Sequence, residues 1–276
     1  MTCSKPSFRI NVVLILFVFV FMTACRKTRP ATEDTSYATQ HMVTEQTFSD
    51  VQNISDQAAD IPSGSHLSYK TTATTISQCA TVTHVNNIIT IDFGPENCMC
   101  NDGRNRRGKI IVTYTGGHYE DSGSVHTITF NNFYQNDNKI TGTKTVTNMG
   151  KNDSGQIYFN ITIVGSVTLN GGGTISTNWN RVRTWIAGYG TLTYTPDDVY
   201  KITGSGKMTL TNGTEADITI TAPLIVANNC HWIEAGTVSY TLKGATHTLD
   251  YGDIPACDDQ ATITLANGSV KSISLP

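Results

Sequence analysis

The sequence predicts an all-β protein: an antiparallel meander of long hairpins, sandwich or barrel-like, preceded by one short amphipathic helix. Three observations support this. From residue 66 onward, apolar and polar residues alternate with a period of two, as in half-buried strands. Turn sequences such as Asn212-Gly213 and Asn267-Gly268 separate the alternating runs, and Asn-Gly is a strong hairpin signal. The runs follow one another without helical stretches between them, which predicts sequential hairpins.

The N-terminal segment, residues 1–24, has the order of a secretory signal peptide. Lys5 and Arg9 come first, an apolar run follows over residues 10–22, and small residues precede Cys25. The run is too short for a membrane-spanning helix, which needs about 20 residues. We therefore predict a cleaved leader; the alternatives are an uncleaved anchor and a plain signal peptide without lipid.

The residues "MTAC" that end at Cys25 resemble the lipobox of bacterial lipoproteins. The resemblance implies that Cys25 becomes the lipid-modified first residue, and that the partner at this end of the protein is the membrane. Met22 stands where Leu is commonest in the lipobox. Arg26 stands where Asp often signals inner-membrane retention, so the resemblance favours the cell outer membrane, with the periplasmic or surface face left open.

The segment after Cys25 is predicted as a tether over residues 25–40, followed by a helix over residues 41–62 and an all-β domain over residues 63–276. Pro62 ends the helical pattern. The helix would lie against the β domain or stand between it and the membrane. Apolar residues recur at helical steps of three and four: Phe48, Val51, Ile54, Ala58 and Ile61.

The composition limits the partners of the mature chain. Without Lys5 and Arg9, 17 of the 19 basic residues remain against 22 acidic residues, so the net charge is −5. A mildly acidic chain argues against nucleic-acid binding, which requires a basic face. Charged residues make up only 15% of the chain, so its solubility depends on hydroxyl and amide groups on the outer faces of strands.

A duplicated element connects two distant parts of the chain. Residues 90–98, "TIDFGPENC", match residues 248–257, "TLDYGDIPAC", and each copy has a cysteine upstream. In the oxidising compartment that a secretory leader implies, the duplication favours disulfides between Cys79 and Cys98 and between Cys230 and Cys257. Four cysteines nevertheless allow three connectivities.

Cys100 is left over from the predicted disulfides. It is either a spare thiol or a competitor of Cys98 for Cys79. The single Cys-x-Cys lacks the second ligand pair of a structural zinc site, so we expect no metal and no cofactor.

The duplicated Asp92 and Asp250 allow two interpretations. Two carboxylates are the groups that general acid–base catalysis requires. An aspartate two residues before a glycine is also typical of turns, in which its side chain accepts from nearby backbone amides. The second interpretation is favoured because duplicated turns would duplicate the aspartate.

Two basic segments are candidates for binding. On a strand, Trp179, Arg181, Arg183 and Trp185 share one face, where aromatic rings and guanidinium groups would stack on a sugar or pair with an anion. The alternative is a ladder in which arginine stems pack on tryptophans. The second segment would hold lipid phosphate, lipopolysaccharide or an acidic glycan, or would be a solvated loop that protects a strand edge; its basic residues are Arg104, Arg106, Arg107 and Lys109.

The lipobox, the helix sequence "FSDVQNISDQA", the stretch "TIDFG" with "GKIIVTYTG", and the late stretch with Cys230, Trp232 and "LDYG" together resemble a family of uncharacterised β-rich lipoproteins of Bacteroidota. The resemblance implies a lipoprotein and carries no activity with it.

The sequence contains no recognisable catalytic constellation, so we expect a protein that is not an enzyme. We predict a membrane-anchored envelope lipoprotein whose β domain has a structural, adhesive or glycan-binding role, with a glycan or another envelope component as partner. The alternative is a periplasmic carrier or chaperone for a lipid or acyl ligand. A carrier needs a contiguous apolar cavity in its sheet, whereas a structural module has a filled core. A hydrolase would need two carboxylates at working distance in a cleft.

Overall fold

The computed structural model describes residues 35–59, 79–117, 119, 121–191 and 195–275. The chain divides into two units, 1–34 and 35–276, and all described residues belong to the second. The predicted signal peptide, Cys25 and most of the predicted tether therefore lie outside the described residues. In the part of the chain that is described, no helix is both long and apolar enough to cross a membrane.

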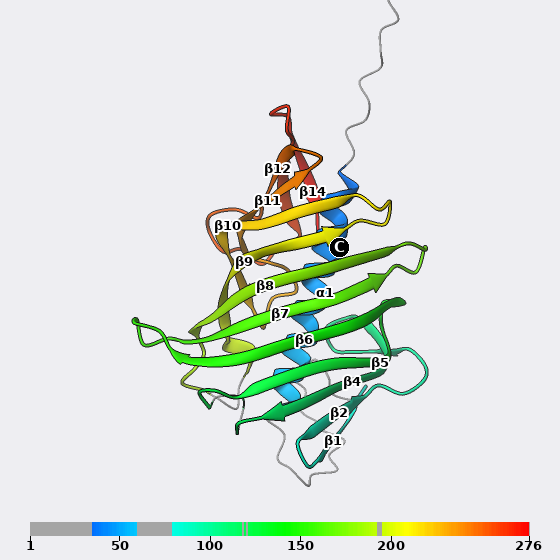
Figure 1. The fold of residues 1–276 in the computed structure, drawn as a ribbon, viewed down its shortest axis with the longest axis vertical. Coiled ribbons are helices and arrows are strands. Elements are labelled where there is room, and N and C mark those ends of the chain that lie inside the picture. The colour runs from blue at the N-terminus through cyan, green and yellow to red at the C-terminus, as the bar shows by residue number, and fades with distance from the viewer. Residues whose placement is uncertain (1–34, 60–78, 118, 120, 192–194, 276) are drawn as a thin grey trace, which may run out of the picture. The chain divides into compact units, whose positions relative to one another are not determined.

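The predicted fold class is confirmed. The described chain forms one helix and one open antiparallel sheet of 14 strands, so the sheet is not closed into a barrel. Strands follow each other in sequence order across the sheet, except that β3 pairs only with β4 (Figure 1). The elements are α1 (Ser36–Ala59), β1 (Thr81–Val85), β2 (Ile88–Asp92), β3 (Cys98–Met99), β4 (Asn105–Thr115), β5 (Val125–Gln135), β6 (Asn138–Lys151), β7 (Ile157–Thr168), β8 (Thr174–Ala187), the 3₁₀ turn η1 (Thr195–Asp197), β9 (Val199–Thr209), β10 (Glu215–Ala227), β11 (Ala235–Leu242), β12 (Ala245–Asp250), β13 (Gln260–Thr264) and β14 (Val270–Ser274).

Tight hairpins make the meander possible. Gln135 pairs with Asn138, which leaves Asn136 and Asp137 as a two-residue loop between β5 and β6. Both loop residues have positive φ, at 49° and 62°, as the type I′ turn that matches strand twist requires. Asn and Asp tolerate this region better than most residues, which suits them to this turn.

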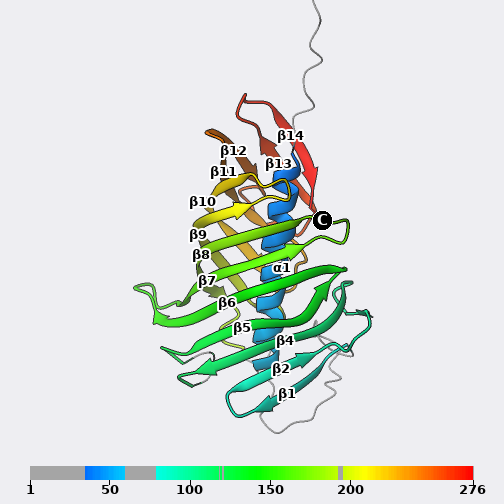
Figure 2. The ribbon, with the colours of Figure 1, turned by 45° about the vertical axis from the view of Figure 1, so that its right-hand side comes forward.

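Helix α1 crosses the strands on the inner side of the sheet, and the sheet curves around it (Figures 1 and 2). The helix therefore lies against the β domain, which is the first of the two predicted placements. It starts at Ser36 rather than at residue 41, so the last residues of the predicted tether are helical, and it spans 24 residues to Ala59. The predicted end of the helix, up to residue 62, lies outside the described residues.

The helix is buried on most of its circumference although it is rich in polar residues. Several hydroxyl groups find their hydrogen-bond acceptors within the helix: Thr44, Thr47 and Ser55 each donate to the backbone oxygen four residues earlier, at 2.7 to 2.8 Å. Such bonds are typical of Ser and Thr inside helices. The remaining buried polar groups of the helix need partners from the sheet.

At Phe48 the helix packs closely on the sheet. Its ring lies beside Trp179 and Phe130, at centroid distances of 6.4 Å each. Gly142 and Gly165 face each other across β6 and β7, and a Cβ atom on Gly165 would lie only 2.7 Å from Cζ of Phe48. The absence of a side chain at Gly165 therefore lets the helix pack directly on the strand backbone.

The cysteine pairing follows the duplication. Cys79 is bonded to Cys98 and Cys230 to Cys257, which confirms both predicted disulfides. Cys100 is a free, buried thiol. It is therefore the spare cysteine of the prediction.

The two duplicated aspartates are turn residues. The amide of Gly94 donates to Oδ1 of Asp92 at 2.9 Å, and the amide of Gly252 donates to Oδ1 of Asp250 at 2.8 Å. The aromatic residue between each pair turns inward and is buried in the core. The turn-chemistry interpretation is confirmed by these bonds.

Candidate functional site

The predicted face of β8 exists but points inward. Trp179, Arg181, Arg183 and Trp185 share one side of the strand, and their exposed fractions are 0, 3, 4 and 4%. The hypothesis of an exposed binding surface is therefore wrong for these residues. The alternative, arginine packed on an aromatic ring, is closer to the structure, since the guanidinium of Arg181 lies 4.6 Å from the ring centre of Trp179.

The predicted basic patch at residues 101–109 is also wrong. Arg104 and Arg106 are 6% and 0% exposed, because β4 begins here and its alternate residues face the interior. Arg107 is on the other side of the strand, half-buried, where its guanidinium lies over the ring of Tyr134 and pairs with Asp137. The segment is therefore neither a free anion-binding patch nor a solvated loop.

These inward arginines meet the acidic residues of the helix. Glu45 accepts from Arg181 at 3.0 Å, and Asp56 accepts from Arg183 at 2.7 Å. Asp50 lies 3.1 Å from Nε of Arg104. Because a lone charge in the interior costs several kcal/mol, each acid on the helix needs a base from the β domain: Arg181 and Arg183 on β8, and Arg104 just before β4.

Neutral groups complete the ion pairs. Asp50 also accepts from Gln135 at 2.7 Å, and Asp56 accepts from Gln52 at 2.6 Å. The helix residue His41 shares a 2.6 Å hydrogen bond with the Tyr240 hydroxyl of β11. The helix is thus held along its length by directed polar contacts in addition to apolar packing.

The charge states follow from these contacts. Burial alone would raise the pKa of Glu45, but the positive charge of Arg181 and the contact with His41 outweigh burial and hold the pKa well below its usual range. Burial raises the pKa of Asp198 to about 6, and the opposing hydrogen bonds from Tyr200 and Trp185 and the charge of Arg183 do not offset it. Glu45 is therefore ionised at neutral pH, whereas Asp198 titrates close to it.

Lys144 differs from the buried arginines. It is 3% exposed, and its Nζ donates to the backbone oxygen of Phe48 at 2.8 Å. Burial and then the neighbouring charge of Arg183 lower its pKa to about 7. A lysine in such a site exchanges its proton near neutral pH.

Two adjoining cavities open beside the helix. The first, the inner recess, has a volume of about 40 Å³ and is lined by the cations Lys144, Arg181 and Arg183, by Glu45 and Asp50, and by aliphatic side chains including Ile161, Ile163 and Ile202. The second, the outer recess, has a volume of about 160 Å³ and is lined by Asp50, Asn53, Asp102, Arg104, Asn228, Asn229, Cys230 and His231. Both recesses share Asp50, Asn53, Asn228 and Cys230 in their walls.

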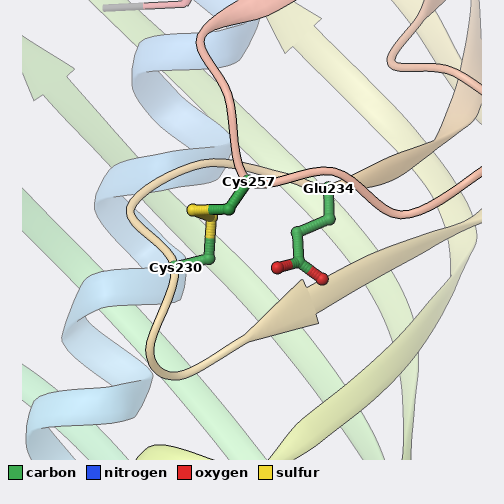
Figure 3. Close-up of side chains that lie close together, drawn as sticks. All are labelled: Cys230, Glu234 and Cys257. Atoms are coloured by element: carbon green, nitrogen blue, oxygen red, sulfur yellow. A yellow bond between two sulfur atoms is a disulfide. The ribbon is translucent and has the colours of Figure 1, made fainter.

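One wall of the outer recess is fixed by a disulfide. Figure 3 shows Cys230 and Cys257 joined, with the carboxylate of Glu234 beside them. The three ligand-type atoms lie within 4.8 Å of one another, but a metal is bound by thiolate and both sulfurs are already in the S–S bond. The cluster therefore stiffens the connection between β10 and β11 and does not serve as a metal site while the bond is intact.

The sequence interpretation missed most of the recess, including Asn53, Lys144, Asn228 and Asn229. The inward direction of Lys144 could have been predicted. Lys144 is an even number of residues away from the apolar Ile140 and Val146, so alternation along the strand places its side chain on the same inner face. Nothing in the sequence indicated that the three asparagines line a recess. Two of them, Asn228 and Asn229, lie in a connection between strands, where asparagine is common.

Comparison with protein-family models, with curated proteins and with solved structures found no match for this chain. The fold and the recess are therefore the basis for any functional inference.

Proposed function

We propose that this chain is an envelope lipoprotein, held in the outer membrane by lipid on Cys25, whose β domain binds a glycan without catalysis. The leader sequence and the "MTAC" residues support the lipid anchor, and the family that the sequence resembles is one of lipoproteins from Bacteroidota. The two disulfides support an oxidising compartment. Cys25 itself lies outside the described residues.

The outer recess carries the glycan-binding proposal. Its walls present amides, carboxylates, a guanidinium group and an imidazole. A sugar offers hydroxyls that donate and accept at once, and an asparagine amide supplies both functions. A volume of about 160 Å³ suits a single sugar ring, and the Cys230–Cys257 bond keeps the wall in place before a ligand arrives, which reduces the entropy that binding costs.

The alternative, a carrier of acyl chains, has less support. A carrier needs a continuous apolar cavity on the concave face of the sheet. Helix α1 occupies that face and is attached there by buried ion pairs. The inner recess, about 40 Å³, leaves too little room for an acyl chain.

Binding is favoured over hydrolysis by the state of the recess carboxylates. Asp102 is bonded to Arg106 at 2.6 Å and 2.8 Å. Burial alone would raise the pKa of Asp102, but the contacts with Arg106 and Arg104 outweigh it and lower the pKa. A general acid needs a raised pKa, and Asp50 is likewise engaged by Arg104.

A glycan array probed with the mature lipoprotein in detergent micelles tests this function. We expect saturable binding that Asn53→Ala and Asn229→Ala each weaken at least tenfold. Asn178→Ala is the matched control, because Asn178 is exposed on the outer face of β8, and it should bind as the wild type does. Saturable uptake of a fluorescent fatty acid without glycan binding would support the carrier instead.

The anchor and its location need separate measurements. Mass spectrometry of the mature N-terminus should find Cys25 acylated, and an unmodified N-terminus would refute the anchor. Protease shaving of intact cells then decides between the surface and the periplasmic face.

A further inference from the structure

The inner recess contains a positive charge that the surrounding protein does not neutralise. Arg181 and Arg183 are paired with Glu45 and Asp56. No carboxylate of the described residues lies within ion-pairing distance of Lys144, whose Nζ donates to the Phe48 backbone oxygen. The remaining acid of the lining, Asp50, is paired with Arg104, so a protonated Lys144 has no counter-charge of its own in the recess.

The residues that line the same recess also include hydrogen-bond donors without an acceptor among the described residues. Nε of Arg181 is buried, and within the described part of the chain it has no hydrogen-bond partner. An ammonium group carries three donors, and Lys144 uses one of them on the helix backbone. Buried donors are normally satisfied, so these groups indicate an acceptor that comes from outside the chain.

Size and surroundings define that acceptor. A cavity needs about 10–15 Å³ to hold one water, so about 40 Å³ admits a few waters or one carboxylate group. Aliphatic walls from Ile161, Ile163 and Ile202 offer nothing to a larger polar group. The recesses share part of their walls, so a sugar ring in the outer recess would lie next to the inner one.

We propose that the glycan residue bound by this protein is an acidic sugar of the uronic acid type, whose carboxylate enters the inner recess and accepts from Nζ of Lys144 and Nε of Arg181. The proposal rests on the glycan-binding function above and names the class of sugar. Charge-assisted hydrogen bonds to a carboxylate are about twice as strong as neutral ones, so this contact would dominate selectivity.

Binding should also be coupled to a proton. The groups around the carboxylate position are Glu45, Asp50 and Asp56 on the helix and Lys144, Arg181 and Arg183 on the sheet; Asp102, Arg104 and His231 face the outer recess. An anion favours the charged form of Lys144, whose pKa is about 7 without ligand. Affinity for the acidic sugar should therefore fall as the pH rises from 6 to 9.

The test compares D-glucuronate with D-glucose by titration calorimetry of the mature lipoprotein in detergent micelles at pH 6. We expect glucuronate to bind at least tenfold more tightly. Lys144→Met should abolish this preference and leave weak binding of both sugars, whereas Asn53→Ala should weaken both. Lys207→Met is the matched control, since Lys207 is exposed on the outer face of β9, and it should keep the preference.

The outcomes separate the two proposals. Equal affinity for both sugars in the wild type would overturn the acidic-sugar assignment and leave the glycan-binding function standing. Acetate bound as tightly as glucuronate would identify a site for small anions and overturn the assignment as well. No binding of any sugar would overturn the proposed function itself. Circular dichroism checks that Lys144→Met is folded; Lys144→Gln replaces it if it is not, and the wild-type comparison decides on its own if both fail.

Discussion

Replacing the buried Lys144 by methionine should stabilise the ligand-free protein at neutral pH. Lys144 lies in the core of the helix–sheet interface, and burial lowers its pKa from 10.5 to about 7. In the unfolded chain the same lysine keeps its ordinary pKa and binds a proton up to about pH 10. Between these two values the unfolded state binds more protons than the folded state, so the free energy of unfolding rises with pH.

The magnitude follows from the two pKa values. A pKa lowered from 10.5 to about 7 corresponds to a cost of about 5 kcal/mol at pH 6. Methionine has a similar length and no charge, so it removes this cost. It also removes the hydrogen bond to the Phe48 oxygen, which is worth about 1 kcal/mol. The net gain should be about 2–4 kcal/mol at pH 6 and should shrink toward zero at pH 10.

Urea unfolding followed by tryptophan fluorescence at pH 6, 7.5 and 9 measures this effect. The wild type should gain about 1.4 kcal/mol per pH unit above pH 7 from this one group, and Lys144→Met should lack that slope. The reasoning is refuted if the variant is less stable than the wild type at pH 6, or if both proteins show the same slope.

Three further predictions concern stability. Glu45→Ala leaves a buried arginine without its partner and should cost about 3–5 kcal/mol, which a thermal melt would show as a clear drop in Tm. Gly165→Ala places a Cβ 2.7 Å from the helix phenylalanine and should cost about 1–3 kcal/mol, whereas Gly171→Ala, where a Cβ meets only open space, should leave urea unfolding unchanged. Replacing Cys230 and Cys257 by serine should cost about 3 kcal/mol in the same assay and weaken glycan binding; unaltered affinity would argue against the disulfide-fixed wall.

Local patterns explain why the strands and their connections could be predicted. Alternation along β4 to β10 depends on residues that are neighbours in sequence, and turns such as Asn212-Gly213, where Gly213 has a φ of 80°, depend on the φ angles that single residues tolerate. The duplicated Asp-aromatic-Gly turns and both disulfides also follow from short, matching stretches. Each of these features is set by residues that are close to one another in the sequence.

Whether the arginines of β8 face the solvent or the interior could not be predicted from such local patterns. Arg181 and Arg183 share a strand face with Trp179, and charged residues normally lie outside, so a surface was the natural expectation. They are buried because helix residues more than 120 positions earlier supply the opposite charge. That compensation exists only once helix and sheet have packed together.

Local sequence was enough to predict the strands, the turns and the existence of one helix, because each depends on local conformational preference; the repeated pattern only favoured the disulfide pairing that the structure shows. The tertiary structure alone decided which face of the sheet is covered, which charges are neutralised and where a recess remains. These depend on contacts between segments far apart in the chain: helix α1, the turn before β4 and the connection after β10. A buried charge is stable only beside its counter-charge, and only the folded chain determines where that counter-charge lies.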